Sequence, residues 1–465
     1  MAAQDLVKMS IAQVAELIAS SQVSPLDLVD ATLARIDEMD GTINSYITVL
    51  GEQARQAARE AERSIRAGRY LGPLHGVPIG LKDIIATDGV LTTCGSKVLK
   101  DWVPGYDATV TQRLAAAGAV VVGKQHCYEF ACAPPNPLYG PTRNPWNTGR
   151  DTGGSSSGTG AAIAAYMCYA GIGSDTGGSV RNPAGVCGVV GLKQTYGRAS
   201  RHGVFPLSWS LDHAGPMART VEDIAIILQI IAGHDPMDPS TVDLPVPDFR
   251  KPLTGDVKGL RAGVPVNYFF DDVQPEVEAS VRQAIEVLEG AGVAVEEVTI
   301  PHSDYIMPAW WTIFSAETAA VHARLMREKG ADYSQAVLDT VGPGAFITSG
   351  ALLKAQQART LITRGMNEVL QKVDVLLTPA VPMVAWPLGA EGMRALGGTV
   401  VEVFNKLAFT TAAFNLTGHP AISVPCGLNS EGLPIGLQIA GRAFDEVTVL
   451  RVAHAYEQLA PPPRL

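Results

Sequence analysis

From about residue 70 onward, short apolar runs alternate with helical segments and with loops rich in glycine and proline. The segments GVPIGLKD, AAAGAVVVGK and GVVGLKQTYG each contain one such run, and similar runs return after residue 260. Apolar runs that alternate with helices are typical of a sheet whose two faces are both covered. The sequence therefore predicts an α/β fold.

Helix and strand signals extend this prediction to the rest of the chain. Residues 9–40 predict two helices, the second capped by Ser24 with Pro25 in its first turn. Residues 54–68 predict a polar surface helix, and QPEVEASVRQAIEVLEGAG predicts a helix with Val277, Val281, Ala284 and Leu288 on one face. We further expect a buried helix at 160–173, a loop at 234–259, helices over 306–371, strands in LRAGVP, VAVEEVTI, VDVLLTP and PIGLQIAG, and a closing helix in DEVTVLRVAHAYEQLA.

The composition favours one large body over several small ones. Only 18% of the 465 residues are charged, against a usual fraction of about one quarter. A larger body needs proportionally less polar surface. We therefore expect residues 1–465 to form a single domain, with a catalytic core at about 70–225 and a more variable helical region at about 300–370.

Charge and cysteine content bear on partners and location. The net charge is −10 and no lysine or arginine run is present, which argues against nucleic-acid binding. The start, MAAQDLVKMS, lacks the layout of a signal peptide, and no apolar run is long enough to span a bilayer. The six scattered cysteines are typical of free thiols. We expect a cytoplasmic protein with no membrane and no nucleic-acid partner.

Two familiar motifs occur in broken form. GAVVVGKQ (118–125) matches a phosphate loop until Gln125, which stands where Ser or Thr would bind magnesium, so we interpret it as a buried strand. GSSSG (154–158) fits a nucleophile elbow centred on Ser156, but we do not expect a strand in the preceding YGPTRNPWNTGRDTG. A histidine-dependent α/β-hydrolase that uses His202 or His213 therefore stays a remote alternative.

Two blocks rich in glycine and serine indicate a different site. They are GGSSSGTG (153–160) and GSDTGGSVRNPAG (173–185), and the second sets Ser179 among glycines that let backbone amides approach a ligand. A serine nucleophile needs a base at neutral pH. Lys82, at the end of the apolar run VPIGLKD, is the candidate, because lysines are rarely buried without a purpose or a partner.

Together with GLKQTYGRASRHGVFPLSWSLDHAGPMART (191–220), GHPAISVPCG (418–427) and LPIGLQIAGRAFDE (433–446), these blocks resemble the amidase signature family. The resemblance covers most of the chain. It implies a large mixed β-sheet sandwiched between α-helices, and hydrolysis of a small-molecule amide without a cofactor or a metal. A homodimer is an expectation at the level of the family.

The resemblance also implies roles for individual residues. By position, Ser179 is the nucleophile, and Ser155 and neutral Lys82 relay its proton; the Gly154–Ser155 peptide bond is expected to be cis. The amides of Thr176, Gly177 and Gly178, with that of Ser179, are expected to form an oxyanion hole.

Five further residues are expected to support these groups. Asp175 and Arg181 are predicted to form a supporting ion pair, and Asp83 to lie behind the catalytic groups. Ser157 and Ser174 either extend the hydrogen-bond network or are ordinary loop hydroxyls.

The amide that is cleaved stays open, because a fold does not name its substrate. We favour an independent amidase for a small carboxylic amide; the alternative is the glutaminase subunit of a tRNA-dependent amidotransferase. For the alternative, Arg359 aligns with a carboxylate-binding arginine, but SGALLKAQQ lacks the tyrosine-rich stretch expected beside it. We expect pocket walls from 126–140, 303–350 and 380–405, with Trp310, Trp311 and Phe314 either lining the pocket or packing in the core.

Overall fold

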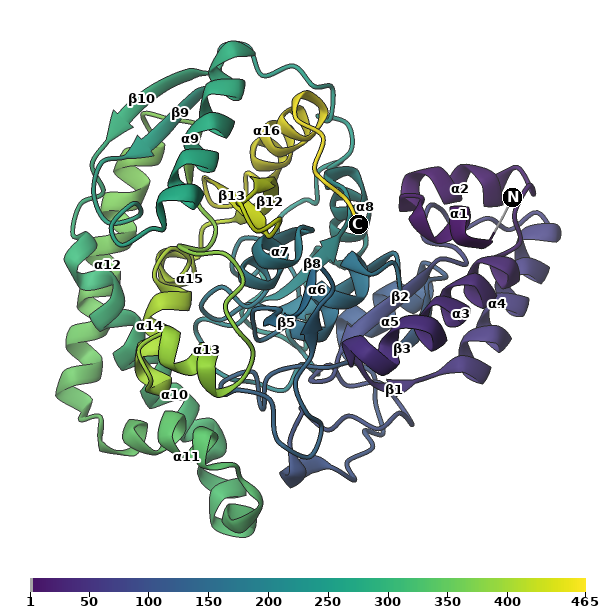
Figure 1. Cartoon of the computed structure of the whole chain (residues 1–465), viewed down its shortest axis with the longest axis horizontal. Coiled ribbons are helices and arrows are strands. Elements are labelled where there is room, and N and C mark those ends of the chain that lie inside the picture. The colour runs from purple at the N-terminus through teal and green to yellow at the C-terminus, as the bar shows by residue number, and fades with distance from the viewer. Residues whose placement is uncertain (1–2) are drawn as a thin grey trace.

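A single mixed sheet of 11 strands organises the molecule (Figure 1). The computed structural model describes residues 3–465, apart from the side chains of residues 3, 390, 393, 400 and 401. The strand order is β1-β3-β2-β6-β8-β7-β12-β13-β11-β9-β10. Strand β2 runs parallel to β3 and β6, and β9 runs parallel to β10 and β11, whereas the other neighbours are antiparallel. The predicted α/β sheet is confirmed.

The elements follow in the order of the chain. The strands are β1 (Tyr46–Val49), β2 (Pro78–Lys82), β3 (Val120–Gln125), β4 (Arg143–Asn144), β5 (Asn147–Asp151), β6 (Ala170–Ser174), β7 (Val190–Lys193), β8 (Ala214–Ala218), β9 (Arg261–Pro265), β10 (Ala294–Val298), β11 (Val375–Pro379), β12 (Ala421–Leu428) and β13 (Pro434–Gly441). The α-helices are α1 (Ala3–Lys8), α2 (Ile11–Ala19), α3 (Pro25–Ile43), α4 (Gly51–Arg66), α5 (Thr109–Ala116), α6 (Ser157–Ala164), α7 (Arg181–Cys187), α8 (Val221–Ile231), α9 (Pro275–Gly290), α10 (Ile306–Lys329), α11 (Gln335–Val341), α12 (Ser349–Leu370), α13 (Ala390–Ala395), α14 (Val400–Ala408), α15 (Ala412–Thr417) and α16 (Glu446–Leu459).

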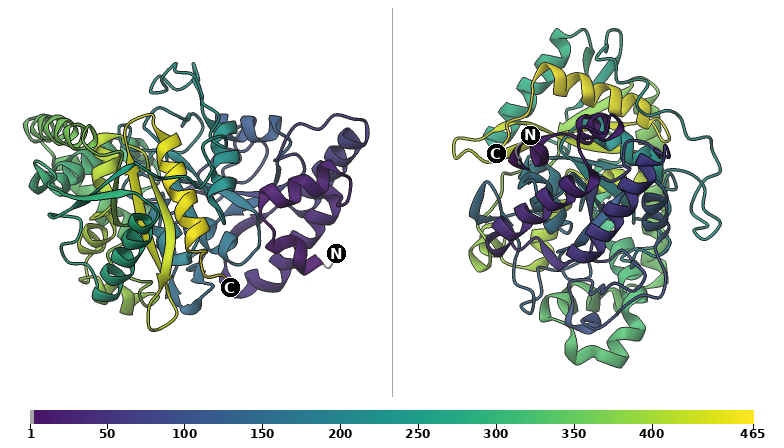
Figure 2. Two further views of the ribbon diagram at one scale, coloured as in Figure 1. Left: turned by 90° about the horizontal axis from the view of Figure 1, so that it is seen from above. Right: turned by 90° about the vertical axis from the view of Figure 1, so that its right-hand side faces the viewer.

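Helices cover both faces of the sheet (Figure 2). Helices α3, α4, α6 and α7 contribute to one buried apolar cluster, and α2, α8, α9 and α16 contribute to a second. Successive side chains of a strand point to opposite faces of the sheet. In strand β3, Val120 and Val122 accordingly belong to the first cluster, and Val121 packs against the second. Because strands from residues 46 to 441 share one sheet, the architecture supports the proposal of a single domain.

Local signals explain several of these elements. Ser24 caps α3 by accepting a hydrogen bond from the amide of Leu26, and Pro25 occupies the first turn. The face of α9 that was predicted from its periodicity, Val277, Val281, Ala284 and Leu288, is buried. The predicted loop at 234–259 contains no helix or strand, and all strands expected after residue 260 are present.

The prediction of one helix over 160–173 was wrong. Helix α6 ends at Ala164, Tyr166 adopts a left-handed φ of 62°, and the chain then enters the sheet as β6. The small residues serve close packing of a strand: a Cβ atom on Gly173 would lie 2.6 Å from Ser156 Oγ. The small residues therefore indicate tight packing correctly, but part of the tightly packed segment is a strand and not a helix.

The segment before Gly154 also differs from the prediction, because it does contain strands. Strands β4 and β5 form a two-stranded hairpin that is separate from the main sheet. Strand β5 ends at Asp151, so it does not lead directly into GSSSG as a nucleophile elbow requires.

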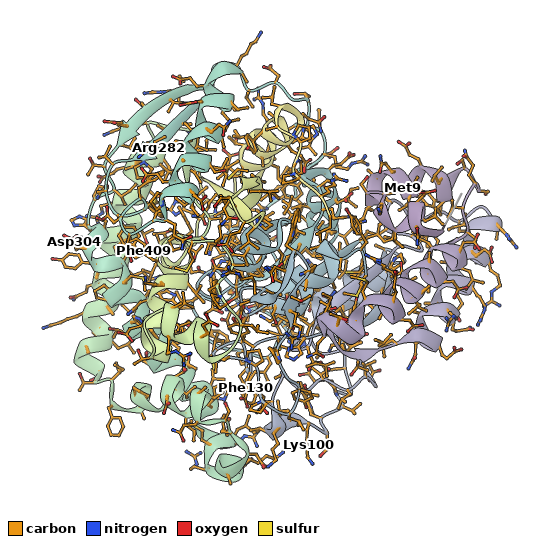
Figure 3. All side chains as sticks on the ribbon, viewed as in Figure 1. Met9, Lys100, Phe130, Arg282, Asp304 and Phe409 are labelled. Atoms are coloured by element: carbon orange, nitrogen blue, oxygen red, sulfur yellow. The ribbon has the colours of Figure 1, made fainter. Side chains whose placement is uncertain are left out.

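The loop after β3 packs against the helical region that follows residue 300 through Phe130, which is labelled in Figure 3. Phe130 is buried there, and its ring centroid lies 4.7 Å from that of His322 on α10 and 5.4 Å from that of Tyr333. This aromatic group fixes part of the expected pocket wall at 126–140 against the helical region that follows residue 300.

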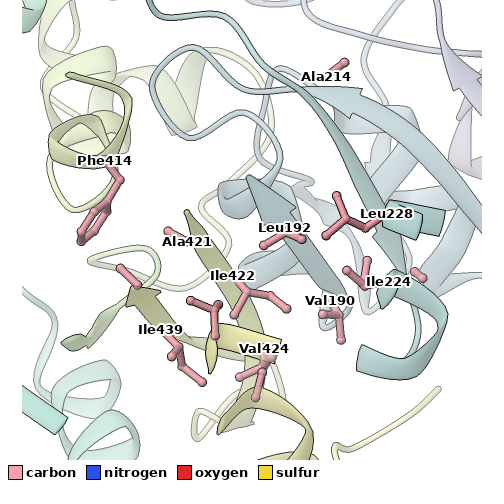
Figure 4. Packing of buried hydrophobic residues seen from close by; sticks show 14 of the residues in the cluster. Val190, Leu192, Ala214, Ile224, Leu228, Phe414, Ala421, Ile422, Val424 and Ile439 are labelled. Carbon is pink, nitrogen blue, oxygen red and sulfur yellow. The ribbon is translucent and has the colours of Figure 1, made fainter. Parts of the chain in front are cut away.

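Buried apolar side chains surround the central strands β7, β12 and β13 (Figure 4). Leu437 on β13 has no exposed surface. We expect Leu437→Ala to lower the free energy of unfolding by about 2–5 kcal/mol, since it leaves a cavity. Leu353 on α12 is 64% exposed, so Leu353→Ala should change that free energy by less than about 0.5 kcal/mol. Chemical denaturation measures both, and equal losses would contradict this description of the core.

Candidate active site

Lys82 is the last residue of β2, and its side chain is fully buried. Its Nζ atom lies 2.7 Å from Ser155 Oγ, 2.9 Å from Ser174 Oγ and 3.1 Å from Ser156 Oγ. Ser174 ends β6, which runs parallel to β2, so both side chains lie at the carboxyl end of neighbouring strands. In open α/β sheets this is where ligands usually bind.

The three hydroxyl neighbours suit an uncharged amine. A neutral amine donates two hydrogen bonds and accepts one, so it can donate to Ser156 and Ser174 and accept from Ser155. No carboxylate contacts Nζ among the hydrogen bonds of the described residues. Burial lowers the pKa of Lys82 to about 8, and Cys127 and Asp175 oppose that shift. A substantial fraction of the amine is therefore neutral near pH 8.

Ser155 and Ser179 face a small cavity. The Gly154–Ser155 peptide bond is cis, as predicted. The two serines lie in the loops before α6 and α7, and both line a cavity of about 20 Å³, which leaves room for about one water molecule. The other lining residues are Tyr128, Ala131, Gly154, Thr176, Gly177, Asn182, Leu207, Trp310, Phe314, Phe404, Leu407 and Ala408.

The turn from Thr176 to Ser179 is held from several sides. Thr176 Oγ1 donates to Asp212, and the carbonyl of Thr176 accepts from Trp310 Nε1 at 3.1 Å. A Cβ atom on Gly177 would lie 2.5 Å from the Trp310 ring, and Gly178 has a φ of 123° that favours glycine. The turn therefore requires glycine at both positions.

The backbone amides of this turn do not all point the same way. The amide of Gly178 donates to Asp175 Oδ1 at 2.8 Å, so it is already engaged and does not match the oxyanion-hole role predicted for it. The amides of Thr176, Gly177 and Ser179 have no hydrogen-bond acceptor among the described residues. These three are the amides available to a ligand.

The predicted ion pair between Asp175 and Arg181 is present and fully buried. Arg181 donates to both carboxylate oxygens of Asp175, at 2.8 and 3.0 Å, and its remaining donors bond Thr411, Asn415 and Gln438. Burial alone would raise the pKa of Asp175, but the guanidinium holds that pKa well below its usual range. The pair is thus ionised and saturated with hydrogen bonds, which is what a buried pair requires.

The other expected supporting residues differ in their contacts. Ser174 joins the Lys82 cluster, whereas Ser157 Oγ only approaches the carbonyl of His126 at 3.4 Å. Asp83 accepts hydrogen bonds from the amide and the hydroxyl of Thr93, and so it braces the chain that follows Lys82. Sequence reasoning did not include Ser156 in this cluster; its place between Ser155 and Ser157 was the only signal.

The two histidines of the alternative hydrolase stay apart from the serines. His202 and His213 line a neighbouring cavity of about 240 Å³. His213 Nδ1 lies 2.8 Å from the carbonyl of Leu211, and no hydrogen bond among the described residues joins either histidine to Ser155 or Ser179. The geometry gives no support to a histidine-dependent site.

The aromatic residues of α10 serve both expected purposes. Trp310 and Phe314 are buried and also line the cavity beside Ser179. Trp311 Nε1 instead hydrogen-bonds Asn405. Arg359 is not among the residues that line this cavity. Its guanidinium donates hydrogen bonds to Ser210 and to the carbonyl of Leu416 instead.

Three further features concern the described residues as a whole. No group of three or more His, Cys, Asp or Glu side chains in residues 3–465 has the arrangement of a metal site. In the same range no single helix is long and apolar enough to cross a membrane, although the bent pair Gln335–Phe346 and Ser349–Leu370 passes that test when taken together. All six cysteines are free thiols.

Known proteins resemble this chain over nearly its whole length. The family model described as Amidase matches residues 27–450. One relative, from Roseiflexus sp. (strain RS-1), is named as a subunit of glutamyl-tRNA(Gln) amidotransferase. It is 43% identical over 479 residues, which cover 98% of this chain and 97% of that protein.

Two solved structures share the fold. One, described as a vestigial protein complex that reveals the evolutionary origins of an s-triazine catabolic enzyme, has a TM-score of 0.91 and 34% identity, covering 98% of this chain and 100% of the other. The second, a bacterial aryl acylamidase of the amidase signature family, has a TM-score of 0.88 and 28% identity, covering 97% and 96%.

The relatives contradict one expectation from the sequence. We expected a small-molecule amide substrate and no nucleic-acid partner. The relative at 43% identity is instead named as a subunit of glutamyl-tRNA(Gln) amidotransferase. The acidic charge was a poor guide, because a net charge sums over the whole surface and does not describe any one face of it.

Removal of Arg181 tests the buried pair. We expect Arg181→Met to lower the free energy of unfolding by about 3–5 kcal/mol, because Asp175 would keep a buried charge without its partner. Arg324→Met is the matched control, since Arg324 pairs with Glu328 while 72% of its side-chain surface is exposed, and it should change stability little. Urea denaturation of both variants measures the difference, and a small loss in Arg181→Met would refute this account.

Proposed function

Because the chain belongs to the amidase family, we propose that it hydrolyses the side-chain amide of glutamine as the glutaminase subunit of an amidotransferase that acts on glutamyl-tRNA(Gln). The observation that carries the proposal is the 43% identity, over nearly the full length of both chains, with a protein named as one subunit of that enzyme. Likeness of this extent supports a shared role more strongly than a shared fold does. The sequence alone favoured an independent amidase, and this proposal favours the amidotransferase subunit instead.

In the proposed reaction Ser179 Oγ attacks the amide carbon. Its proton passes to Ser155, which gives its own proton to the neutral amine of Lys82. The contact of 2.7 Å between Lys82 Nζ and Ser155 Oγ supports this relay. Ser155 then returns a proton to the leaving nitrogen, which departs as ammonia and leaves an acyl group on Ser179. Water releases the acid by the same path, and the serine regains its proton.

Negative charge develops on the carbonyl oxygen during the attack. We assign its stabilisation to the amides of Thr176, Gly177 and Ser179, which have no acceptor among the described residues. Gly178 is omitted, because its amide holds the Asp175 carboxylate instead. The loss of one such donor costs roughly 2.7–4 kcal/mol in other hydrolases, so this contribution is large.

The lining of the cavity favours a second candidate, an amidase for amides with an apolar acyl group. Trp310, Phe314, Phe404 and Leu407 surround the serines, and none of the described side chains that line the cavity is charged. Glutamine would bring an ammonium group and a carboxylate, and charged groups are costly to bury without partners. Arg359, the expected partner of the carboxylate, donates three of its hydrogen bonds to Ser210 and Leu416.

Modification with a fluorophosphonate tests the nucleophile. We expect intact-mass analysis to find one adduct on the wild-type chain and none on Ser179→Ala, because only an activated serine reacts with this reagent. Ammonia release from glutamine should likewise be lost in Ser179→Ala. An adduct on both proteins would place the nucleophile elsewhere.

The same preparation separates the two candidate functions. Its ammonia release from glutamine is compared with that from phenylacetamide, which has an apolar acyl group. A higher kcat/KM for glutamine supports the glutaminase proposal, whereas a kcat/KM at least 100-fold higher for phenylacetamide would replace it with the second candidate.

The proposed base predicts a pH dependence. Burial lowers the pKa of Lys82 to about 8, and only the neutral amine accepts a proton. The rate of Ser179 modification should therefore level off above about pH 8 and fall roughly tenfold per pH unit below it. Lys82→Ala should lose most of this rate and the pH profile. Modification that is independent of pH between 6 and 9 in the wild-type protein would exclude Lys82 as the base.

A further inference from the structure

Tyr128 touches the Gly154–Ser155 segment in two ways. Its backbone amide donates to the carbonyl of Ser155 at 3.1 Å. Its ring covers Gly154 so closely that a Cβ atom there would lie 2.4 Å from the ring. Tyr128 is buried and also lines the cavity beside Ser155 and Ser179. One residue thus fixes both halves of this dipeptide.

Asp151 completes a closed ring of contacts around the same loop. The Tyr128 hydroxyl donates to Asp151 Oδ1 at 2.9 Å, and the amide of Gly153 donates to the same oxygen at 2.8 Å. The path runs from Tyr128 through Asp151 to Gly153, then along the chain to Ser155 and back to Tyr128. Burial raises the pKa of Asp151 to about 6, so the carboxylate is ionised at neutral pH and accepts both bonds.

The far side of Asp151 is anchored outside the loop. Its carbonyl accepts from Asn144 Nδ2 at 3.0 Å, and its amide donates to the carbonyl of Trp386 at 2.8 Å. The carboxylate therefore projects from a backbone that the β4–β5 hairpin and the segment after β11 both hold. A carboxylate on an anchored backbone can restrain a mobile loop, whereas one on a free loop would move with it.

We propose that Tyr128 and Asp151 are positioning residues that hold the Gly153–Ser155 loop, so that the Ser155 hydroxyl stays within reach of both Lys82 Nζ and Ser179. We assign neither residue a step of the proton transfer, since neither side chain hydrogen-bonds Lys82, Ser155 or Ser179 among the described residues. The inference rests on the proposed relay through Ser155. It adds that the relay depends on a tyrosine hydroxyl and a carboxylate outside the triad.

The experiment measures modification of Ser179 by the fluorophosphonate in four single variants and one double variant. Tyr128→Phe removes the hydroxyl, Asp151→Ala removes the acceptor, and Asp151→Asn keeps an oxygen that can accept both bonds. Tyr169→Phe is the matched control, because the buried Tyr169 hydroxyl donates to the carbonyl of Leu6, away from the site. The maximal rate and the reagent concentration for half-maximal rate are measured, with the midpoint of thermal unfolding.

We expect Tyr128→Phe and Asp151→Ala to lower the maximal rate by about 10- to 100-fold, because a small displacement of a relay group is costly. The half-maximal concentration should change less than about twofold, and Asp151→Asn should recover most of the rate. The double variant Tyr128→Phe/Asp151→Ala should react about as slowly as the slower single variant, since both changes break one clamp. Tyr169→Phe should lower the midpoint but keep the rate.

Other outcomes overturn the proposal. If Tyr128→Phe reacts at the wild-type rate, the clamp has no role in positioning. If Tyr169→Phe slows the reaction as much, the effect is one of general stability. If the wild-type protein is not modified at Ser179 at all, the proposed function fails and the clamp fails with it, which is distinguishable from the first two results.

Discussion

The buried pair between Asp175 and Arg181 is the contact on which the rest of the site depends. Asp175 follows β6 and Arg181 begins α7, so the pair closes the turn that carries Ser179. The remaining donors of Arg181 reach Asn415 and Gln438, which tie that turn to α15 and β13 from the far end of the chain. The carboxylate of Asp175 also accepts a hydrogen bond from the amide of Gly178. The pair therefore holds this amide away from a ligand and leaves the neighbouring amides free to bind one.

Much of the fold and the centre of the site could be predicted from the sequence, because their signals are local. A capping serine and a proline mark the start of α3, and a periodic apolar face marks α9. The lysine at the end of an apolar run and the serine set among glycines made Lys82 and Ser179 candidates from the residues alone, whereas Ser155 and the roles of all three came from the resemblance to the amidase signature family. The structure then brings Lys82 and Ser155 within hydrogen-bond distance.

What could not be predicted depends on contacts between distant segments. The small residues of 160–173 are compatible with tight packing of either a helix or a strand, and only the neighbouring strands decide between them. The direction of the Gly178 amide depends on Asp175. The membership of Ser156 in the Lys82 cluster depends on its contacts with the ends of two strands, Lys82 on β2 and Ser174 on β6. Arg359 could be aligned by sequence, but its hydrogen bond to Ser210 could not be predicted, because the two residues are 149 positions apart in the chain.

The open sheet leaves two strands, β1 and β10, with one unpaired side each. Such edges can pair with the edge of a second molecule, and natural proteins commonly keep them short or place charges on them. Strand β1 has four residues, and β10 has five, with Glu296 and Glu297 at its centre. A large sheet can therefore serve as the platform for a reaction without also becoming a template for its own aggregation.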